Sequence, residues 1–163
     1  MLAKDVAATA LKSTQNMLGM YISDLSDADL LVRPVPGANH TAWQLGHLIA
    51  SESMLKKQYP HFVYPELPAG FVEQHKPTTA SMEPAKGFAS KEEYLKLFNA
   101  ARNATLANLA SCSDADLDKP TEGNMAGFAP NLAAMFLLIS NHVLMHAGQV
   151  TVVRRLLGKP VLF

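Results

Sequence analysis

Apolar residues recur at helical spacing through four long stretches of the chain, and segments rich in proline, glycine and small polar residues separate them. A period of three to four residues sustained over several turns is typical of amphipathic helices. The pattern predicts helices over residues 2–24, 39–57, 90–111 and 131–157. We therefore expect an all-α fold, a four-helix bundle with a long crossover between helices 2 and 3.

The ends of the last two predicted helices carry recognisable capping residues. Ser90 with Glu93 predicts a capping box, in which the hydroxyl and the carboxylate each accept a free backbone N–H group. The last helix follows Pro130 and ends near Gly158, a residue suited to a helix terminus. Arg154 and Arg155 lie in its final turn, where positive charge suits the helix dipole.

One pentapeptide, Ser-Asp-Ala-Asp-Leu, occurs at residues 26–30 and again at 113–117, and a proline follows each copy. Because Ser and Asp favour helix starts, the match could reflect capping chemistry alone. A long helix precedes each copy and another follows it. The matching position favours two helix pairs of the same plan, joined by the central segment.

The central segment, residues 59–88, contains five prolines and two glycines, which exclude a long regular element. Two of the six histidines, His61 and His75, lie in it. Long irregular segments in small domains often cover a site. The segment is therefore either a lid over a pocket or a plain crossover between the two helix pairs.

Composition limits the class of protein. The 163 residues fit one domain, residues 1–163, and 48% are hydrophobic while 17% are charged. Fourteen basic residues balance fourteen acidic ones, which argues against a nucleic-acid partner or an anionic membrane.

Three further features predict a cytoplasmic protein. The single cysteine, Cys112, excludes an internal disulfide, fits a reducing compartment and is expected to be buried as a small apolar residue. The N-terminal residues lack the pattern of a signal peptide. The most apolar run, residues 132–140, is shorter than the roughly 20 residues that span a bilayer.

The strongest chemical signal is a histidine pair, His142 and His146, inside the last predicted helix. Residues four apart project from one face of a helix, so both imidazoles can reach one metal ion. A third ligand must come from elsewhere. His40 is expected to face water at a helix start, and the irregular segment does not fix His61 or His75.

His47 lies inside a predicted helix among Trp43, Leu48 and Ile49. A lone histidine on an apolar face is more often a satisfied core residue than a ligand. The histidine pair changes that balance, because each buried unpaired imidazole would cost a few kcal/mol. We therefore predict a divalent metal held by His47, His142 and His146. Three protein ligands leave a position open, as in catalytic zinc sites, and imidazole also suits Ni, Fe and Cu.

No second catalytic group stands out. Glu52 is the best carboxylate candidate, although an ordinary exposed helix position is the simpler interpretation, and His75 in the central segment is another candidate. Gln149 could hydrogen-bond a metal-bound water or a ligand, or form a polar helix contact. Gly148 is expected to allow close approach of a helix or ligand, and Met135 and Met145 to fill the core.

Several blocks together resemble the DinB-like superfamily (DinB/YfiT-type bundles). They are Arg33-Pro34-Val35-Pro36-Gly37, Trp43-Gln44-Leu45-Gly46-His47-Leu48, His142-Val143-Leu144-Met145-His146-Ala147-Gly148-Gln149 and Arg154-Arg155-Leu156-Leu157-Gly158. The resemblance implies a bundle with a long crossover, and a divalent metal (Zn or Ni, with Fe also suitable) on His47, His142 and His146. It also implies a homodimer.

Relatives with known activity include transferases and isomerases that use low-molecular-weight thiols, and amidase-like metal-dependent hydrolases. Many carry Glu where this chain has Val143. The leading hypothesis is a metal-dependent enzyme that activates a thiol or water. The alternatives are a non-catalytic, stress-related metal-binding dimer and a bundle with no site at all.

Overall fold

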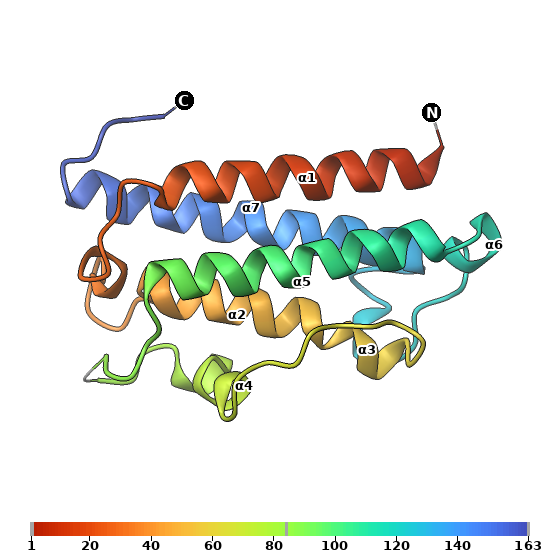
Figure 1. Cartoon of the computed structure of the whole chain (residues 1–163), viewed down its shortest axis with the longest axis horizontal. Coiled ribbons are helices and arrows are strands. Elements are labelled where there is room, and N and C mark those ends of the chain that lie inside the picture. Colours follow the sequence, from red (N-terminus) through yellow and green to blue (C-terminus); the bar gives the residue numbers. More distant parts are fainter. Residues whose placement is uncertain (1, 84, 163) are drawn as a thin grey trace.

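Four long helices form a bundle in the computed structural model, which describes residues 2–83 and 85–162 (Figure 1). They are α1 (Ala3–Ile22), α2 (Thr41–Ser53), α5 (Lys91–Ser111) and α7 (Leu132–Leu156). Helices α1 and α7 run in one direction, and α2 and α5 run in the other. Helix α1 packs against α7 and α5, and α2 packs against α5 and α7. The predicted all-α four-helix bundle is confirmed.

Short helical turns fill the connections: η1 (Asp29–Leu31), α3 (Leu55–Gln58), α4 (Phe71–Gln74), η2 (Pro77–Thr79), α6 (Asp114–Leu117) and η3 (Gly123–Met125). The described residues contain no strand, only an isolated bridge between Pro120 and Asn131. The helix predicted over residues 39–57 is interrupted, because α2 ends at Ser53 and α3 begins at Leu55. The Met54 N–H group approaches the carbonyls of both Ala50 and Glu52, which tightens this last turn.

The long crossover follows from the parallel course of α2 and α5, since the chain must return along the bundle before α5 can begin (Figure 1). Tyr59, Phe62 and Tyr64 bury their rings in one half of the core, and Phe71 buries its ring in the other half. These contacts favour the crossover interpretation of residues 59–88 over a loose lid. Pro84 lies outside the described residues, as do positions 1 and 163 of the predicted domain.

Both copies of the repeated pentapeptide form the same reciprocal box. The Ser26 N–H group donates to the Asp29 carboxylate (2.9 Å) and the Asp29 N–H group donates to Ser26 Oγ (3.1 Å). Ser113 and Asp116 repeat both bonds at 2.9 and 3.1 Å. At Ser90 the hydroxyl accepts the Glu93 N–H group as predicted, while the Glu93 carboxylate pairs with Lys96.

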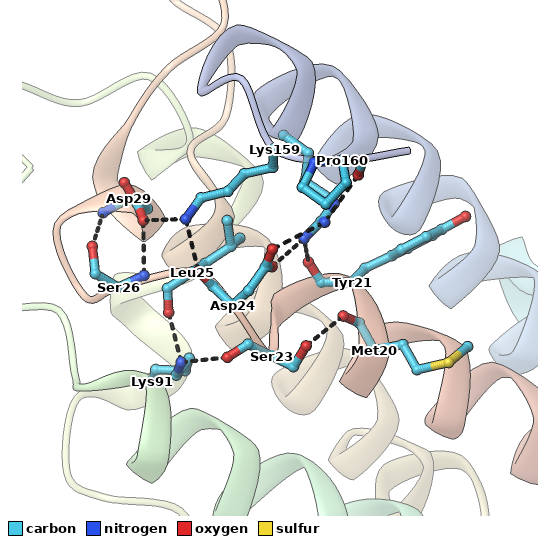
Figure 2. Close-up of polar contacts among 11 residues, drawn as sticks. Met20, Tyr21, Ser23, Asp24, Leu25, Ser26, Asp29, Lys91, Lys159 and Pro160 are labelled. Carbon is cyan, nitrogen blue, oxygen red and sulfur yellow. Dashed lines mark hydrogen bonds and ion pairs between the residues drawn. The ribbon is translucent and has the colours of Figure 1, made fainter. Parts of the chain in front are cut away.

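Basic side chains satisfy the free carbonyls at the C-terminal end of α1 (Figure 2). Lys91 Nζ donates to the carbonyls of Ser23 (2.8 Å) and Leu25 (2.6 Å), and Lys159 Nζ donates to Asp24 O (2.8 Å). Arg154 is buried, pairs with the Asp24 carboxylate and donates to Tyr21 O (2.7 Å). Arg154 therefore ties α7 to α1, a role beyond the predicted dipole interaction.

The apolar core consists of two clusters, one at each end of the bundle, and polar side chains lie between them. The first cluster includes Leu18, Leu48, Phe98 and Val143, and the second includes Leu11, Leu55, Leu109 and Phe136. Each long helix contributes one or two buried polar residues at the junction: Thr14, Glu52, Arg102, Thr105 and Ser140. We refer to these five residues as the polar layer.

An ion pair occupies the middle of the polar layer. Arg102 Nη2 donates to Glu52 Oε2 (3.1 Å), and Nε lies 2.9 Å from Oε1 as a close but poorly aligned contact. Arg102 Nη1 also donates to Leu11 O and Thr14 Oγ1 on α1. The expectation that Glu52 is an exposed helix residue is wrong, because its partner arrives from α5, far away in the sequence. Burial raises the pKa of Glu52, and the charge of Arg102 opposes that shift.

Helix α7 is the one described helix long and apolar enough to cross a membrane, a property that core helices of bundles share. The predicted limit on apolar length considered only residues 132–140, whereas the apolar helix extends from Leu132 to Leu156. In the structure α7 packs against α1 and α2 and buries Phe136, Val143 and Val150 in the core. Its place in the fold is that of a bundle helix.

Candidate metal centre

Two neighbouring helices bring three histidines together. His47 comes from α2, and His142 and His146 come from successive turns of α7. One ring nitrogen of each lies within 4.8 Å of the corresponding nitrogens of the other two. Nε2 of His142 and Nε2 of His146 are 3.2 Å apart. The structure thus unites the histidines that the sequence singled out.

The surroundings of all three imidazoles favour their neutral form. Burial is the main cause and lowers the pKa of His47, of His142 to about 4 and of His146 to about 3. Repulsion from neighbouring histidines lowers the pKa of His142 and His146 further, and an interaction of the His146 ring with the Gln149 side chain partly opposes the shift of His146. Neutral imidazoles offer the lone pairs that a metal ion requires.

Two contacts orient His47. Its Nδ1 lies 3.2 Å from the backbone carbonyl of His75, and a carbonyl only accepts, so we assign the proton to Nδ1 and the lone pair to Nε2. Trp43, one turn earlier on α2, stacks on the ring with centroids 4.7 Å apart and planes 9° from parallel. Trp43 Nε1 in turn donates to Thr79 Oγ1 (3.1 Å). Nothing in the sequence predicts the contact with the His75 carbonyl, whereas Trp43 stands at helical spacing from His47.

The donor set fits a divalent metal. Nitrogen ligands about 2.0–2.1 Å from a tetrahedral zinc ion lie about 3.3 Å from one another. The 3.2 Å between the two α7 nitrogens matches that spacing, whereas the wider separations of up to 4.8 Å require the rings to move slightly closer. His146 is buried, but His47 and His142 are partly exposed. The cluster is therefore accessible from solvent on one side.

The remaining histidines have other roles. His40, expected to face water, is 1% exposed, because its Nδ1 caps α2 by accepting the Trp43 N–H group (3.1 Å) and its ring packs edge-on to Phe88. Both ring nitrogens of His75 have partners, so it is not a free acid or base. His61 is exposed.

The other residues singled out in the sequence also differ in where the structure places them. Glu52 is engaged by Arg102, so it is not a free carboxylate. Gln149 is exposed beside His146. Cys112 and Met135 are buried as expected, but Met145 is 54% exposed because it faces away from the core. No helix of this chain packs closely on Gly148, since a Cβ there would meet no atom within 4 Å, so of the two predicted roles the close helix contact is wrong and the ligand contact stays a prediction.

Gly46, by contrast, is required for close packing. A Cβ at this position would lie 2.1 Å from the His75 ring, which is buried and hydrogen-bonded at both ring nitrogens. We expect Gly46→Ala to cost about 1–3 kcal/mol, the usual penalty for overpacking, despite the better helix propensity of alanine. Gly148→Ala is the matched control and should gain up to about 1 kcal/mol. Urea unfolding of both variants measures the difference, and equal effects would contradict the packing argument.

The fold is a helical bundle, and its helices α2 and α7 group three histidine nitrogens that could hold one metal ion. The chain belongs to the DinB superfamily, whose family model matches residues 10–150. A search of curated proteins found no match.

Solved structures share the fold at low sequence identity. A conserved protein from Enterococcus faecalis superposes with a TM-score of 0.69 at 14% identity, covering 98% of this chain and 99% of that one. YfiT from Bacillus subtilis gives the same TM-score and identity, covering 96% of this chain and 89% of its own. YfiT is described as "a probable metal-dependent hydrolase with an unusual four-helix bundle topology".

Proposed function

We propose that the protein is a metal-dependent enzyme in which His47, His142 and His146 hold one divalent ion. The observation that carries the proposal is the convergence of three neutral imidazole nitrogens at the junction of α2 and α7. Zn and Ni are the preferred metals, and Fe also suits imidazole ligands. A metal bound here would lower the pKa of a coordinated thiol or water and so supply a nucleophile at neutral pH.

Residues around the cluster would orient its histidines and contact a bound ligand. The His75 carbonyl keeps the proton of His47 on Nδ1, and Trp43 restrains the ring. Gln149 stands exposed next to His146, where its side chain can hydrogen-bond a bound ligand. Val143 is buried in the core and supplies no acid or base.

For the substrate we propose a low-molecular-weight thiol, used in a transfer reaction, as the superfamily resemblance implies. Hydrolysis by activated water is the alternative, since YfiT is described as a metal-dependent hydrolase. A non-catalytic metal-binding protein is the second candidate, and a specific observation favours it. Glu52 and His75, the two groups considered for acid–base work, are both buried: Glu52 is paired with Arg102, and both ring nitrogens of His75 have hydrogen-bond partners.

We propose a cytoplasmic homodimer as the working form. Helix α7 exposes a row of large apolar side chains that a second copy could cover: Leu137, Leu144, Met145, Val152 and Leu156. Cys112 is buried and forms no disulfide bond, which suits a reducing compartment. Light scattering of the purified protein tests the dimer, and a monomeric mass at micromolar concentration would contradict it.

Metal addition tests the proposed site directly. Untagged protein should purify with about one equivalent of metal, and adding Zn or Ni at a thousand times Kd to the metal-free form should stabilise it by about 4 kcal/mol. His142→Ala should abolish this gain because only two ligands remain. His61→Ala removes an exposed histidine outside the cluster and should retain the gain. Identical metal responses of wild type and His142→Ala would refute the site. If the site binds metal as expected, turnover assays with thiols and amides distinguish a metal-dependent enzyme from a non-catalytic metal-binding protein.

A further inference from the structure

His75 lies in the crossover, yet its backbone carbonyl contacts a candidate ligand on α2. The carbonyl oxygen is 3.2 Å from His47 Nδ1. A hydrogen bond of this kind fixes which nitrogen of a histidine carries its proton and in which direction the other lone pair points. The position of the His75 carbonyl therefore matters to the cluster, although the His75 ring is not part of it.

The His75 side chain is fixed by hydrogen bonds at both ring nitrogens. Nδ1 lies 2.7 Å from Phe71 O on α4, and because a carbonyl only accepts, Nδ1 is the donor. Nε2 then has a lone pair and accepts from the Tyr94 hydroxyl of α5 at 2.8 Å. His75 is 1% exposed and Tyr94 is fully buried. Neither bond is easily exchanged for a bond to water.

A third element closes the site around the His75 ring. The ring occupies the space directly against Gly46, where a Cβ would lie 2.1 Å from its Cδ2 atom. Gly46 immediately precedes His47 on α2, so the residue that admits the ring adjoins the residue that its carbonyl contacts. Helices α2, α4 and α5 thus hold His75 from three sides, and the fold itself sets the carbonyl position.

We propose that His75 is a positioning residue: its buried ring holds its own carbonyl against His47 Nδ1 and thereby directs the Nε2 lone pair of His47 towards His142 and His146. The proposal rests on the proposed metal function for its biological meaning, but the orientation of His47 can be measured without metal. The crossover then orients His47, a candidate metal ligand on α2, although the crossover itself lies outside the four long helices.

The experiment measures the tautomer of His47 by ¹⁵N NMR in the metal-free protein, and the Zn affinity by competition with a chromophoric chelator. In the wild type His47 should show only the Nδ1-protonated form. His75→Ala should give a mixture of both forms and lower Zn affinity about 10–100-fold, the usual cost of losing a partner of a ligating histidine. His75→Asn can still donate to Phe71 O and should recover part of the affinity.

Tyr94→Phe provides a gentler variant in case His75→Ala does not fold. It removes only the hydroxyl that holds His75 Nε2 and should lower Zn affinity about tenfold. Tyr64→Phe is the matched control, because it also removes one buried hydroxyl, bonded to Thr105 Oγ1 at 2.9 Å in the other half of the core. The control should lose similar stability while keeping the wild-type tautomer and affinity.

The outcomes separate the two proposals. If His47 keeps a single tautomer in the folded His75 or Tyr94 variants, and their Zn affinity equals that of Tyr64→Phe, the positioning role is overturned. If the tautomer changes as expected but wild-type protein binds no metal, the positioning role stands and the proposed function fails.

Discussion

Replacing Arg102 with methionine should destabilise the fold by about 3–5 kcal/mol, because the substitution leaves the Glu52 carboxylate buried without its counter-ion. Arg102 is 0% exposed and Glu52 is 2% exposed. The change also removes the hydrogen bonds from Arg102 to Leu11 O and Thr14 Oγ1, and with them a connection between α5 and α1. Urea unfolding monitored by circular dichroism gives the free energy of unfolding.

The double variant Glu52→Leu with Arg102→Met provides the control for this prediction. Replacing a whole buried ion pair by apolar side chains is often neutral or stabilising, so the double variant should regain most of the lost stability. If Arg102→Met lowers the free energy of unfolding by less than about 1 kcal/mol, the loss is that expected for an exposed ion pair. Such a result would contradict the argument from the burial of Arg102 and Glu52.

The metal-free protein should lose stability steeply as the pH falls from about 6.5 towards 4. Burial lowers the pKa of His40 to about 4 and of His146 to about 3, and it also lowers the pKa of His47, His75 and His142. Below pH 6.5 the unfolded chain therefore binds protons that the folded chain does not. Stability is fully present above that pH, and His40, His142 and His146 each contribute a loss of about 1.4 kcal/mol per pH unit until the pH reaches their folded-state pKa.

Denaturant midpoints at a series of pH values, with chelator present, measure this slope. His40→Asn keeps a side chain able to cap α2 and should reduce the slope by about one proton. A stability that is flat between pH 6.5 and 5 in the wild type would show that the buried histidines protonate without unfolding the protein.

The sequence predicted the four helices because each has a sustained apolar stripe, and the last two also have recognisable capping residues at their ends. It also predicted which histidines meet, since His142 and His146 share a helix face and His47 lies in an apolar stretch. These features depend on residues close together in the sequence, so they can be predicted without knowledge of the tertiary contacts.

The polar residues of the core were harder to interpret. The burial of Glu52 and His40 depends on partners that tertiary contacts supply, namely Arg102 on α5 and the ring of Phe88. One signal was nevertheless available. Thr14, Arg102 and Ser140 each occupy an apolar-stripe position of their helix, where a lone polar residue indicates a partner across the core. A backbone carbonyl such as that of His75 leaves no comparable trace in a sequence.

The stacking of Trp43 on His47 has a practical consequence for spectroscopy. Trp43 is the only tryptophan of the chain, so its ultraviolet emission comes from a single place, in van der Waals contact with a candidate ligand. The intrinsic fluorescence of the unlabelled protein is thus a built-in optical probe of that imidazole. A metal titration followed by tryptophan fluorescence would report occupancy of the histidine cluster, rather than the general stability of the bundle.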